Sequence, residues 1–190
     1  MKKIVIGTVA LLFLLAGCGQ KKESTEPSKD TTTEALQSTL PVLENANNNT
    51  VVTKTLVLPV DENGVQQTQT ITYKGKQFLT LTIQQKRQVS EDLKNFIAEH
   101  GLETAKQALK EGEDKDESVQ EARKIPGFSL ETNLLSETEI ETKTSYDFQV
   151  LDVKKASESK YLKNVGLENL LKNEPEEYIA NRVASGATVQ

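Results

Sequence analysis

Residues 139–150 read EIETKTSYDFQV, and this stretch decides the fold class. A period of two runs through it, because its odd positions are charged or polar and its even positions carry side chains suited to a core. The even positions are Ile140, Thr142, Thr144, Tyr146, Phe148 and Val150. So long an alternation predicts a strand with one face on a hydrophobic core and the other in water. Tyr146 is therefore expected to be a core residue.

Other segments predict further strands. They are expected at residues 51–58, 65–73, 78–85 and 128–134, before the strand at 139–150. The first three are expected to form a meander, because the pair Asn63-Gly64 is typical of a tight hairpin turn. In the third strand, Leu79, Leu81 and Ile83 are expected on one face, since they recur at every second position.

Helical signals separate and follow these strands. Helices are expected from Ser90 to about residue 109, over residues 117–124, around residues 167–171 and from Pro175 to Gly186. Ser90 supplies a capping hydroxyl, and Gly101 is expected to bend or break the helix that it begins. The order βββ-α-ββ-α predicts an α+β domain, an antiparallel β-sheet of about five strands with helices packed on one face.

The beginning of the chain has the pattern of a lipoprotein signal. Lys2 and Lys3 precede an uncharged apolar run, which is shorter than the roughly 20 residues of a membrane-spanning helix. The run ends in Leu15-Ala16-Gly17-Cys18, which resembles the bacterial lipobox. The resemblance implies cleavage before Cys18 and attachment of a diacylglyceryl group to its sulfur. Such an anchor would hold the protein on a membrane without spanning it.

Four regions are expected along the chain. They are the signal peptide at 1–17, the lipidated Cys18 with a disordered tether at 18–49, the α+β domain at 50–185 and a flexible C-terminus at 186–190. The tether is polar and lacks aromatic residues, so it cannot bury enough apolar surface to offset its chain entropy.

Composition narrows the function classes. The chain of 190 residues has a net charge of −5, and removal of Lys2 and Lys3 with the signal peptide changes this to −7. An acidic domain argues against nucleic-acid binding, which calls for a basic patch. Cys18 is the only cysteine, so its acylation leaves no thiol for a disulfide, a metal or a nucleophile. We therefore expect no cofactor and no metal.

Three groups of polar residues are candidate sites, and each also has a structural interpretation. His100 is the only histidine, so it lacks the partners that a metal site needs, and a place at a helix C-terminus is favoured by the helix dipole. An acidic run is a candidate Ca²⁺ site, although it does not match the EF-hand loop. The run comprises Glu111, Glu113, Asp114, Asp116 and Glu117. It is favoured instead as an acidic loop before the next helix.

A second set of carboxylates lies along the last strand. Glu137, Glu139 and Glu141, with Lys143 beside them, are expected on its outward face. Paired carboxylates catalyse glycoside hydrolysis, but charges of this kind more often solvate a sheet face or protect an edge. The chain has neither a G-x-S-x-G motif nor a glycine-rich phosphate loop. No catalytic residue is therefore predicted.

The sequence TKTLVLPVDENGVQQTQTITYKGK at 53–76, which ends in a Tyr-Lys-Gly turn, resembles the YehR-like bacterial lipoproteins. The Gly127-Phe128 step resembles the opening of their late hairpin, and the similarity extends over about residues 51–155. The resemblance implies the α+β fold and a lipid anchor, and it implies no functional residue, because this is a domain of unknown function.

We expect a lipid-anchored, extracytoplasmic binding or interaction module rather than an enzyme. Its membrane attachment is expected through Cys18, on the outer face of the cell membrane, in a Gram-positive envelope rather than an outer membrane. An envelope-associated hydrolase is the alternative from another class. Two more alternatives are a structural envelope partner and a source of a peptide pheromone, since cleavage releases the apolar residues 11–17.

Overall fold

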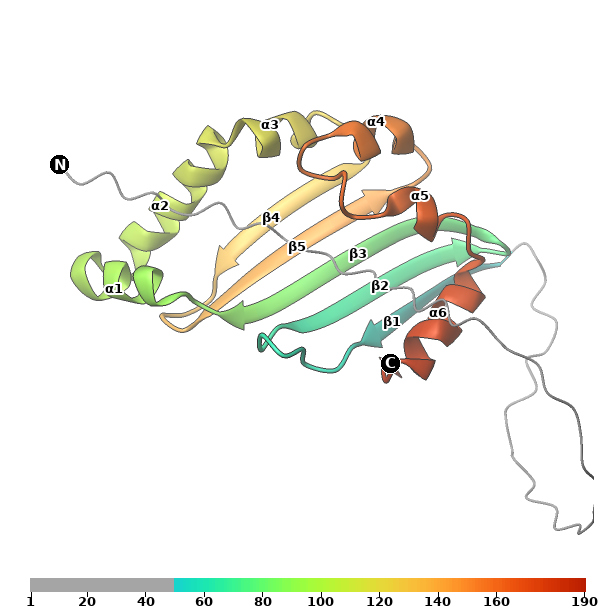
Figure 1. Cartoon of the computed structure of the whole chain (residues 1–190), viewed down its shortest axis with the longest axis horizontal. Helices are drawn as coiled ribbons and strands as arrows, with labels where there is room; N and C mark the ends of the chain where they lie inside the picture. Colours follow the sequence, from blue (N-terminus) through green and yellow to red (C-terminus); the bar gives the residue numbers. More distant parts are fainter. Residues whose placement is uncertain (1–49) are drawn as a thin grey trace, which may run out of the picture.

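The computed structural model describes residues 50–190 (Figure 1). Cys18 and the segments expected to be the signal peptide and the tether lie outside these described residues. The elements are β1 (Val51–Val57), β2 (Gln66–Lys74), β3 (Gln77–Gln88), α1 (Glu91–His100), α2 (Leu102–Lys115), α3 (Glu117–Arg123), β4 (Phe128–Leu134), β5 (Glu139–Asp147), α4 (Val153–Glu158), α5 (Leu167–Leu170), α6 (Pro175–Ala184) and β6 (Thr188–Val189). The predicted α+β class is confirmed.

The strands form one antiparallel sheet in the order β4-β5-β3-β2-β1-β6. Six strands replace the expected five or so, because Thr188 and Val189 pair with Val57 and Leu56. The sequence predicts a flexible end over residues 186–190, whereas in the structure this end extends the sheet. The reason is that Gly186, at a φ of 96°, turns the chain from α6 back onto the β1 edge.

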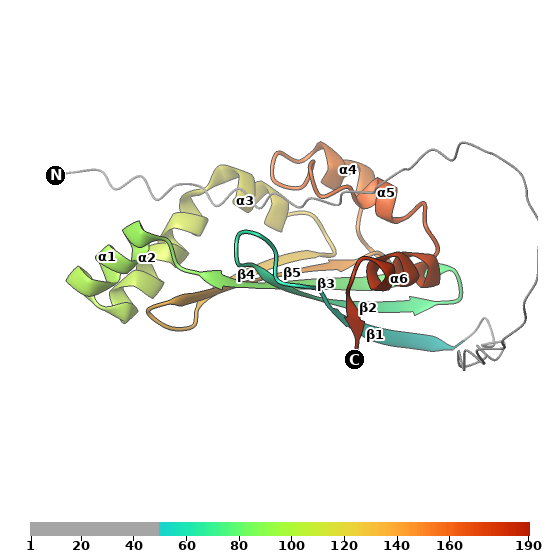
Figure 2. The same cartoon turned by 60° about the horizontal axis from the view of Figure 1, so that its bottom comes forward.

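The helices lie on one face of the sheet, and the opposite face carries none of them (Figure 2). Helices α1 and α2 cover one end of the sheet, and α6 lies toward the other end, over β1 and β2 (Figure 1). We call these the covered face and the open face. On the open face, threonines of neighbouring strands stand opposite one another, with Thr55 beside Thr70 and Thr70 beside Thr82.

Two separate hydrophobic clusters fill the covered face. The larger one joins the sheet to α3–α6 and includes Leu56, Ile71, Leu81 and Tyr146. The smaller one packs α1 and α2 against the far end of the sheet. Its buried members are Val89, Ile97, Ala105, Leu134 and Ile140. Tyr146 is fully buried, which confirms the predicted core face of the 139–150 segment up to this residue.

Beyond Tyr146 that prediction is wrong. The strand ends at Asp147, and Val150 is 59% exposed. Phe148 packs on the edge of the larger cluster from outside the strand. The chain turns here because the amide of Asp147 donates to the carbonyl of Gly127 at 2.7 Å, which brings the Gly127 turn against the end of β5.

The expected face of the third strand also needs correction. Phe78 is buried with Leu81 and Ile83, and Leu79 is only half-buried. The register between β2 and β3 shifts beside Tyr73, which leaves Leu79 as the extra residue of a β-bulge. A bulge reverses the alternation of the strand. Odd-numbered residues before the bulge and odd-numbered residues after it therefore lie on opposite faces, which a constant period of two does not predict.

The expected helices are present, with one boundary moved, and α4 (Val153–Glu158) is a helix that the sequence analysis did not predict. Ser90 caps α1, and Gly101, at a φ of 83°, breaks the helical stretch into α1 and α2. Helix α2 then continues to Lys115 through most of the acidic run, where a loop was expected. Within residues 50–190, no helix is long and apolar enough to cross a membrane.

Candidate functional site

The single histidine ends a helix, as its sequence context indicates. His100 is the last residue of α1, and its ring lies 4.6 Å from the ring of Phe96. Its Nε2 is 3.5 Å from a carboxylate oxygen of Glu99. No group of acidic, cysteine or histidine side chains suited to a metal ion occurs among the described residues. The position supports the structural interpretation.

Intramolecular contacts engage most of the acidic run. Asp116 caps α3 by accepting from the amides of Ser118 at 2.9 Å and Val119 at 3.3 Å. Arg123 binds Glu113 at 2.6 Å and Asp114 at 3.3 Å. Because these carboxylates are capping or neutralised, they support helices and do not form a cation site.

The carboxylates of the last strand are dispersed. Glu137 lies in the turn before β5, and Glu139 is the first residue of the strand. Glu141 is on the open face, where it accepts from Nε2 of Gln84 and lies 3.9 Å from Nζ of Lys86. These contacts match the solvating role that charges have on an exposed sheet face.

A line of uncharged polar residues crosses the covered face between the two hydrophobic clusters. Gln67 on β2 stands opposite Gln85 on β3, Gln85 opposite Thr142 on β5, and Thr142 opposite Thr132 on β4. We call these four residues the polar band. Nε2 of Gln85 donates to Oε1 of Gln67 at 2.9 Å, which leaves the Gln67 amino group and Oε1 of Gln85 for other partners.

The next row of the sheet adds two buried polar side chains. Gln69 and Thr144 flank Ile83, and both are almost fully inaccessible to solvent. The hydroxyl of Tyr178 on α6 donates to Oε1 of Gln69 at 2.8 Å. Nε2 of Gln69 has no partner among the described residues. A buried amide donor without an acceptor costs about 1–3 kcal/mol, so it calls for an explanation.

A second buried polar atom without a partner belongs to a residue on the same face, two rows of the sheet away from the polar band. It is the hydroxyl of Tyr146, two residues along β5 from Thr144. Burial raises the pKa of Tyr146 far above its usual range, against a smaller opposing effect of Thr144. Burial also raises the pKa of Tyr161 to about 12, with the charges of Glu113 and Asp116 adding to it. Both phenols therefore stay protonated and able to donate at any physiological pH.

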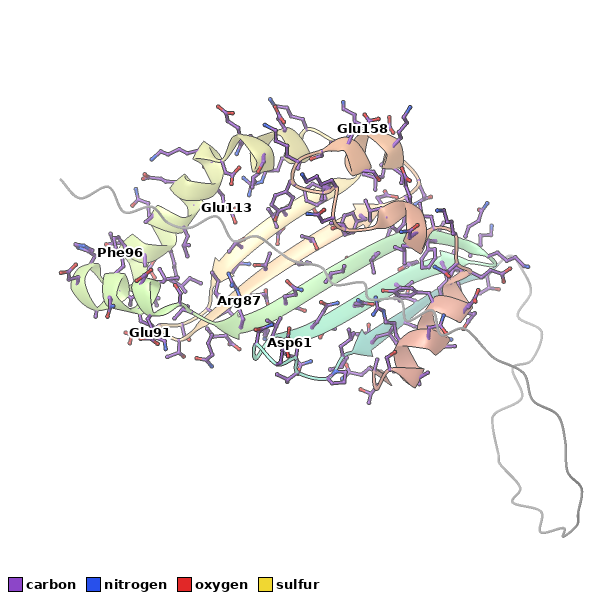
Figure 3. All side chains as sticks on the ribbon, in the orientation of Figure 1. Asp61, Arg87, Glu91, Phe96, Glu113 and Glu158 are labelled. Carbon is purple, nitrogen blue, oxygen red and sulfur yellow. The ribbon has the colours of Figure 1, made fainter. Side chains whose placement is uncertain are left out.

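One cation stands at the end of this polar region. Arg87 lies two residues along β3 from Gln85, with Ile140 of the smaller cluster opposite. It is half-buried and makes no hydrogen bond or ion pair within residues 50–190. Figure 3 shows it in the part of the sheet between α2 and the β1–β2 turn that carries Asp61. An arginine that is not neutralised by the protein is suited to bind an anionic group.

Helix α6 is held over the sheet by a separate ionic cluster. Nζ of Lys54 lies 3.0 Å from Oε2 of Glu176, and the hydroxyl of Tyr73 donates to the same carboxylate. Burial acts to raise the pKa of Glu176, but the hydrogen bonds from Tyr73 and Lys54 and the Lys54 charge lower it overall. The cluster positions α6, and with it Tyr178 above Gln69.

The alternation of residues in β2 already indicated this polar region, although the sequence analysis did not interpret it in that way. Gln67 and Gln69 occupy odd positions of a strand whose odd positions also carry Ile71 and Tyr73. Polar residues at positions that alternation assigns to the core mark either an error of register or a buried polar site. The structure shows that the register is correct and that both glutamines lie on the covered face, where Gln69 is buried.

These features define a class of protein. It is an α+β domain whose antiparallel sheet has helices on one face and, on that face, polar side chains between two hydrophobic clusters. A family model for YehR-like proteins matches residues 51–182. The chain belongs to the YehR-like family.

Solved structures resemble this chain over most of its length. An NMR structure of a protein from Streptococcus pneumoniae TIGR4 is 64% identical, with a TM-score of 0.70, over 87% of this chain and 100% of that chain. An NMR structure of the E. coli YehR protein is 18% identical, with a TM-score of 0.48, over 74% of this chain and 91% of that chain. A comparison with curated proteins finds no significant match.

Proposed function

We propose that this protein is a lipid-anchored, extracytoplasmic binding module that holds a small polar ligand on the covered face of its sheet. The lipobox-like stretch at Leu15–Cys18 supports the anchor, with Cys18 attached to the outer face of the cell membrane. The polar band is the binding surface, and the buried Gln69 lies in the next row of the sheet. The described domain then stands outside the cytoplasm on a tether of about 30 residues, whose coil dimension is roughly 30 Å.

One observation carries the proposal: Nε2 of Gln69 is buried without an acceptor. Native proteins pair nearly all of their buried polar groups with protein or water. Here a second unpaired group, the Tyr146 hydroxyl, lies on the same face of the sheet. An unpaired amide donor next to a band of amides and hydroxyls matches a ligand that supplies acceptor oxygens.

The proposal contains no catalytic step. A hydrolase needs a nucleophile or a general base next to a group that tunes it. The pKa changes of the described carboxylates come from capping and ion pairs, as in Asp116 and Glu176, and these residues hold helices in place. Gln and Thr side chains orient a ligand but do not transfer its protons at neutral pH.

Native mass spectrometry of the full-length protein tests this function directly. The protein is extracted from the membranes of its own host in mild detergent, without refolding. A stoichiometric added mass beyond the lipid is expected, and Gln69→Leu should reduce it while Gln84→Leu, on the open face, should not. A bare mass for the wild-type protein, with no small molecule retained from host extracts, would overturn the proposal.

A further inference from the structure

The covered face holds its polar groups in a definite linear order. Gln69 is the register partner of Ile83, Gln67 that of Gln85, and Arg87 lies two residues further along β3. These positions alternate with residues that face the other way, so their side chains share the covered face. An unpaired donor on β2, an amide pair between β2 and β3, and an unpaired cation on β3 therefore lie in successive rows of the sheet.

From this order we infer that the ligand is an extended peptide of three or four residues whose free terminal carboxylate binds Arg87. The inference rests on the binding function proposed above and names the chemical class of its ligand.

The length of the site sets the length of the ligand. Arg87 is four positions along β3 from Ile83, the register partner of Gln69, which is about 13 Å at the rise of a β-strand. An extended peptide has the same rise, so three or four residues reach from one end to the other. An inorganic anion at Arg87 would leave the amides and Gln69 unengaged.

The chemistry of the middle of the site matches a peptide backbone. The Gln67 amino group is a donor, and Oε1 of Gln85 is an acceptor, because the bond between these two side chains uses only their other atoms. A peptide unit presents one carbonyl and one amide in the same way. The Nε2 of Gln69 then takes a carbonyl further along the ligand, which satisfies its missing bond.

Charge decides the direction of the ligand. Arg123, which also lies near the covered face, is neutralised by Glu113 and Asp114, whereas Arg87 has no such partner among the described residues. A guanidinium binds a carboxylate through two parallel hydrogen bonds. The carboxyl end of the peptide is therefore placed at Arg87, and its amino end toward Gln69 and Tyr178.

The test uses two pools of randomised tripeptides and tetrapeptides, one with free carboxylates and one with carboxamide ends. Each pool is incubated with the full-length protein in detergent, and the retained mass is read by native mass spectrometry. Retention from the free-acid pool alone is expected. Equal retention from both pools, or none from either, would overturn the inference.

Substitutions locate the carboxylate. Arg87→Gln should reduce retention about 10- to 100-fold, the range for one charge-assisted hydrogen-bonded pair. Lys86→Gln removes the same charge one residue away on the open face, so it should leave retention unchanged. Equal losses in the two variants would show a general charge effect and contradict the assignment. Thermal unfolding of both variants checks that each remains folded.

The two proposals fail separately. A non-peptide mass on the protein from its host, with no retained peptide, would leave the binding function standing and overturn the peptide ligand. A bare protein that also retains nothing from either pool would mean that ordered water alone satisfies Gln69 and Tyr146, and both proposals would fall.

Discussion

The hydroxyl of Tyr178 donates to Oε1 of Gln69 at 2.8 Å, although 109 positions separate the two residues along the chain. The bond joins the last helix to the second strand at the point where the sheet has its buried polar groups. It also orients the Gln69 amide, so that Nε2 is directed away from Tyr178 and remains unpaired. A contact between distant segments thus creates the donor on which the binding proposal depends.

Removing the Tyr178 hydroxyl should destabilise the protein. Tyr178→Phe leaves Oε1 of Gln69 buried without a donor, which costs about 1–3 kcal/mol. The double variant Gln69→Met with Tyr178→Phe should lose less, because no buried polar group remains in either side chain. Urea unfolding of the ligand-free protein measures both. A double variant that is less stable than Tyr178→Phe would contradict this account of the pair.

Tyr146 should be among the most sensitive core positions. Tyr146→Ala removes a fully buried aromatic side chain and is expected to cost about 3–5 kcal/mol of unfolding free energy. Val150→Ala, at an exposed position once assigned to the same face, should cost less than about 0.5 kcal/mol. Denaturant titration of both variants gives the comparison, and a small loss in Tyr146→Ala would reverse the assigned faces of β5.

Gly127 and Gly64 offer a matched pair at positive φ. Both have left-handed backbones, at 82° and 74°, so alanine at either position is strained by about 1–2 kcal/mol. At Gly127 a Cβ would also lie 2.6 Å from the carbonyl oxygen of Asp147, whereas at Gly64 it would meet nothing. Gly127→Ala should therefore cost clearly more than Gly64→Ala in thermal unfolding. Equal costs would mean that the Asp147 turn can shift.

The Lys54–Glu176 contact predicts a loss of stability in acid. The pKa of Glu176 is lower in the folded protein than in the unfolded chain, so its contribution is complete above the unfolded value and is lost as the pH falls through the folded one. Both side chains are partly exposed, so Glu176→Gln should cost only about 0.5–1 kcal/mol at pH 7. The difference should therefore shrink as the pH falls below the ordinary glutamate pKa of 4.5 and through the lower pKa of the folded protein. A constant difference across this range would exclude a role for the charge.

Lipidation at Cys18 is expected to determine where the protein resides. Cys18→Ala should release the protein from membranes or leave an uncleaved precursor, because the proposed diacylglyceryl anchor requires this sulfur. Membrane fractionation and gel mobility measure the outcome. Cys18→Ser keeps the size of the side chain and should behave in the same way. Membrane attachment and mobility identical to those of the native protein would contradict the lipobox assignment.

Local patterns predicted most of the strands and helices. Asn63-Gly64, the Ser90 cap and the alternation at 139–146 each act through neighbours a few residues away, so each can be recognised in the sequence. The errors occurred where a distant contact changed a local pattern. The bulge at Leu79 and the pairing of Thr188–Val189 with β1 depend on neighbouring strands, which the periodicity of a single segment does not reveal.

The candidate site was less predictable than the fold. Gln67, Gln85 and Arg87 are polar residues in the sequence, and only Gln67, through the alternation of β2, is distinguished by its local pattern from the open-face Gln84 and Lys86. Only the register of β2 and β3 with β5 places the first three on the covered face, between two hydrophobic clusters.

The sequence by itself therefore determined the fold class, the core face of β5 and the expectation of a lipid anchor, because period, turn residues and a signal pattern are local properties of a chain. The tertiary structure alone decided which polar side chains are buried together and which of them lack partners. Burial and pairing depend on contacts between side chains of β2, β3, β5 and α6. These contacts form only when the sheet and its helices have assembled.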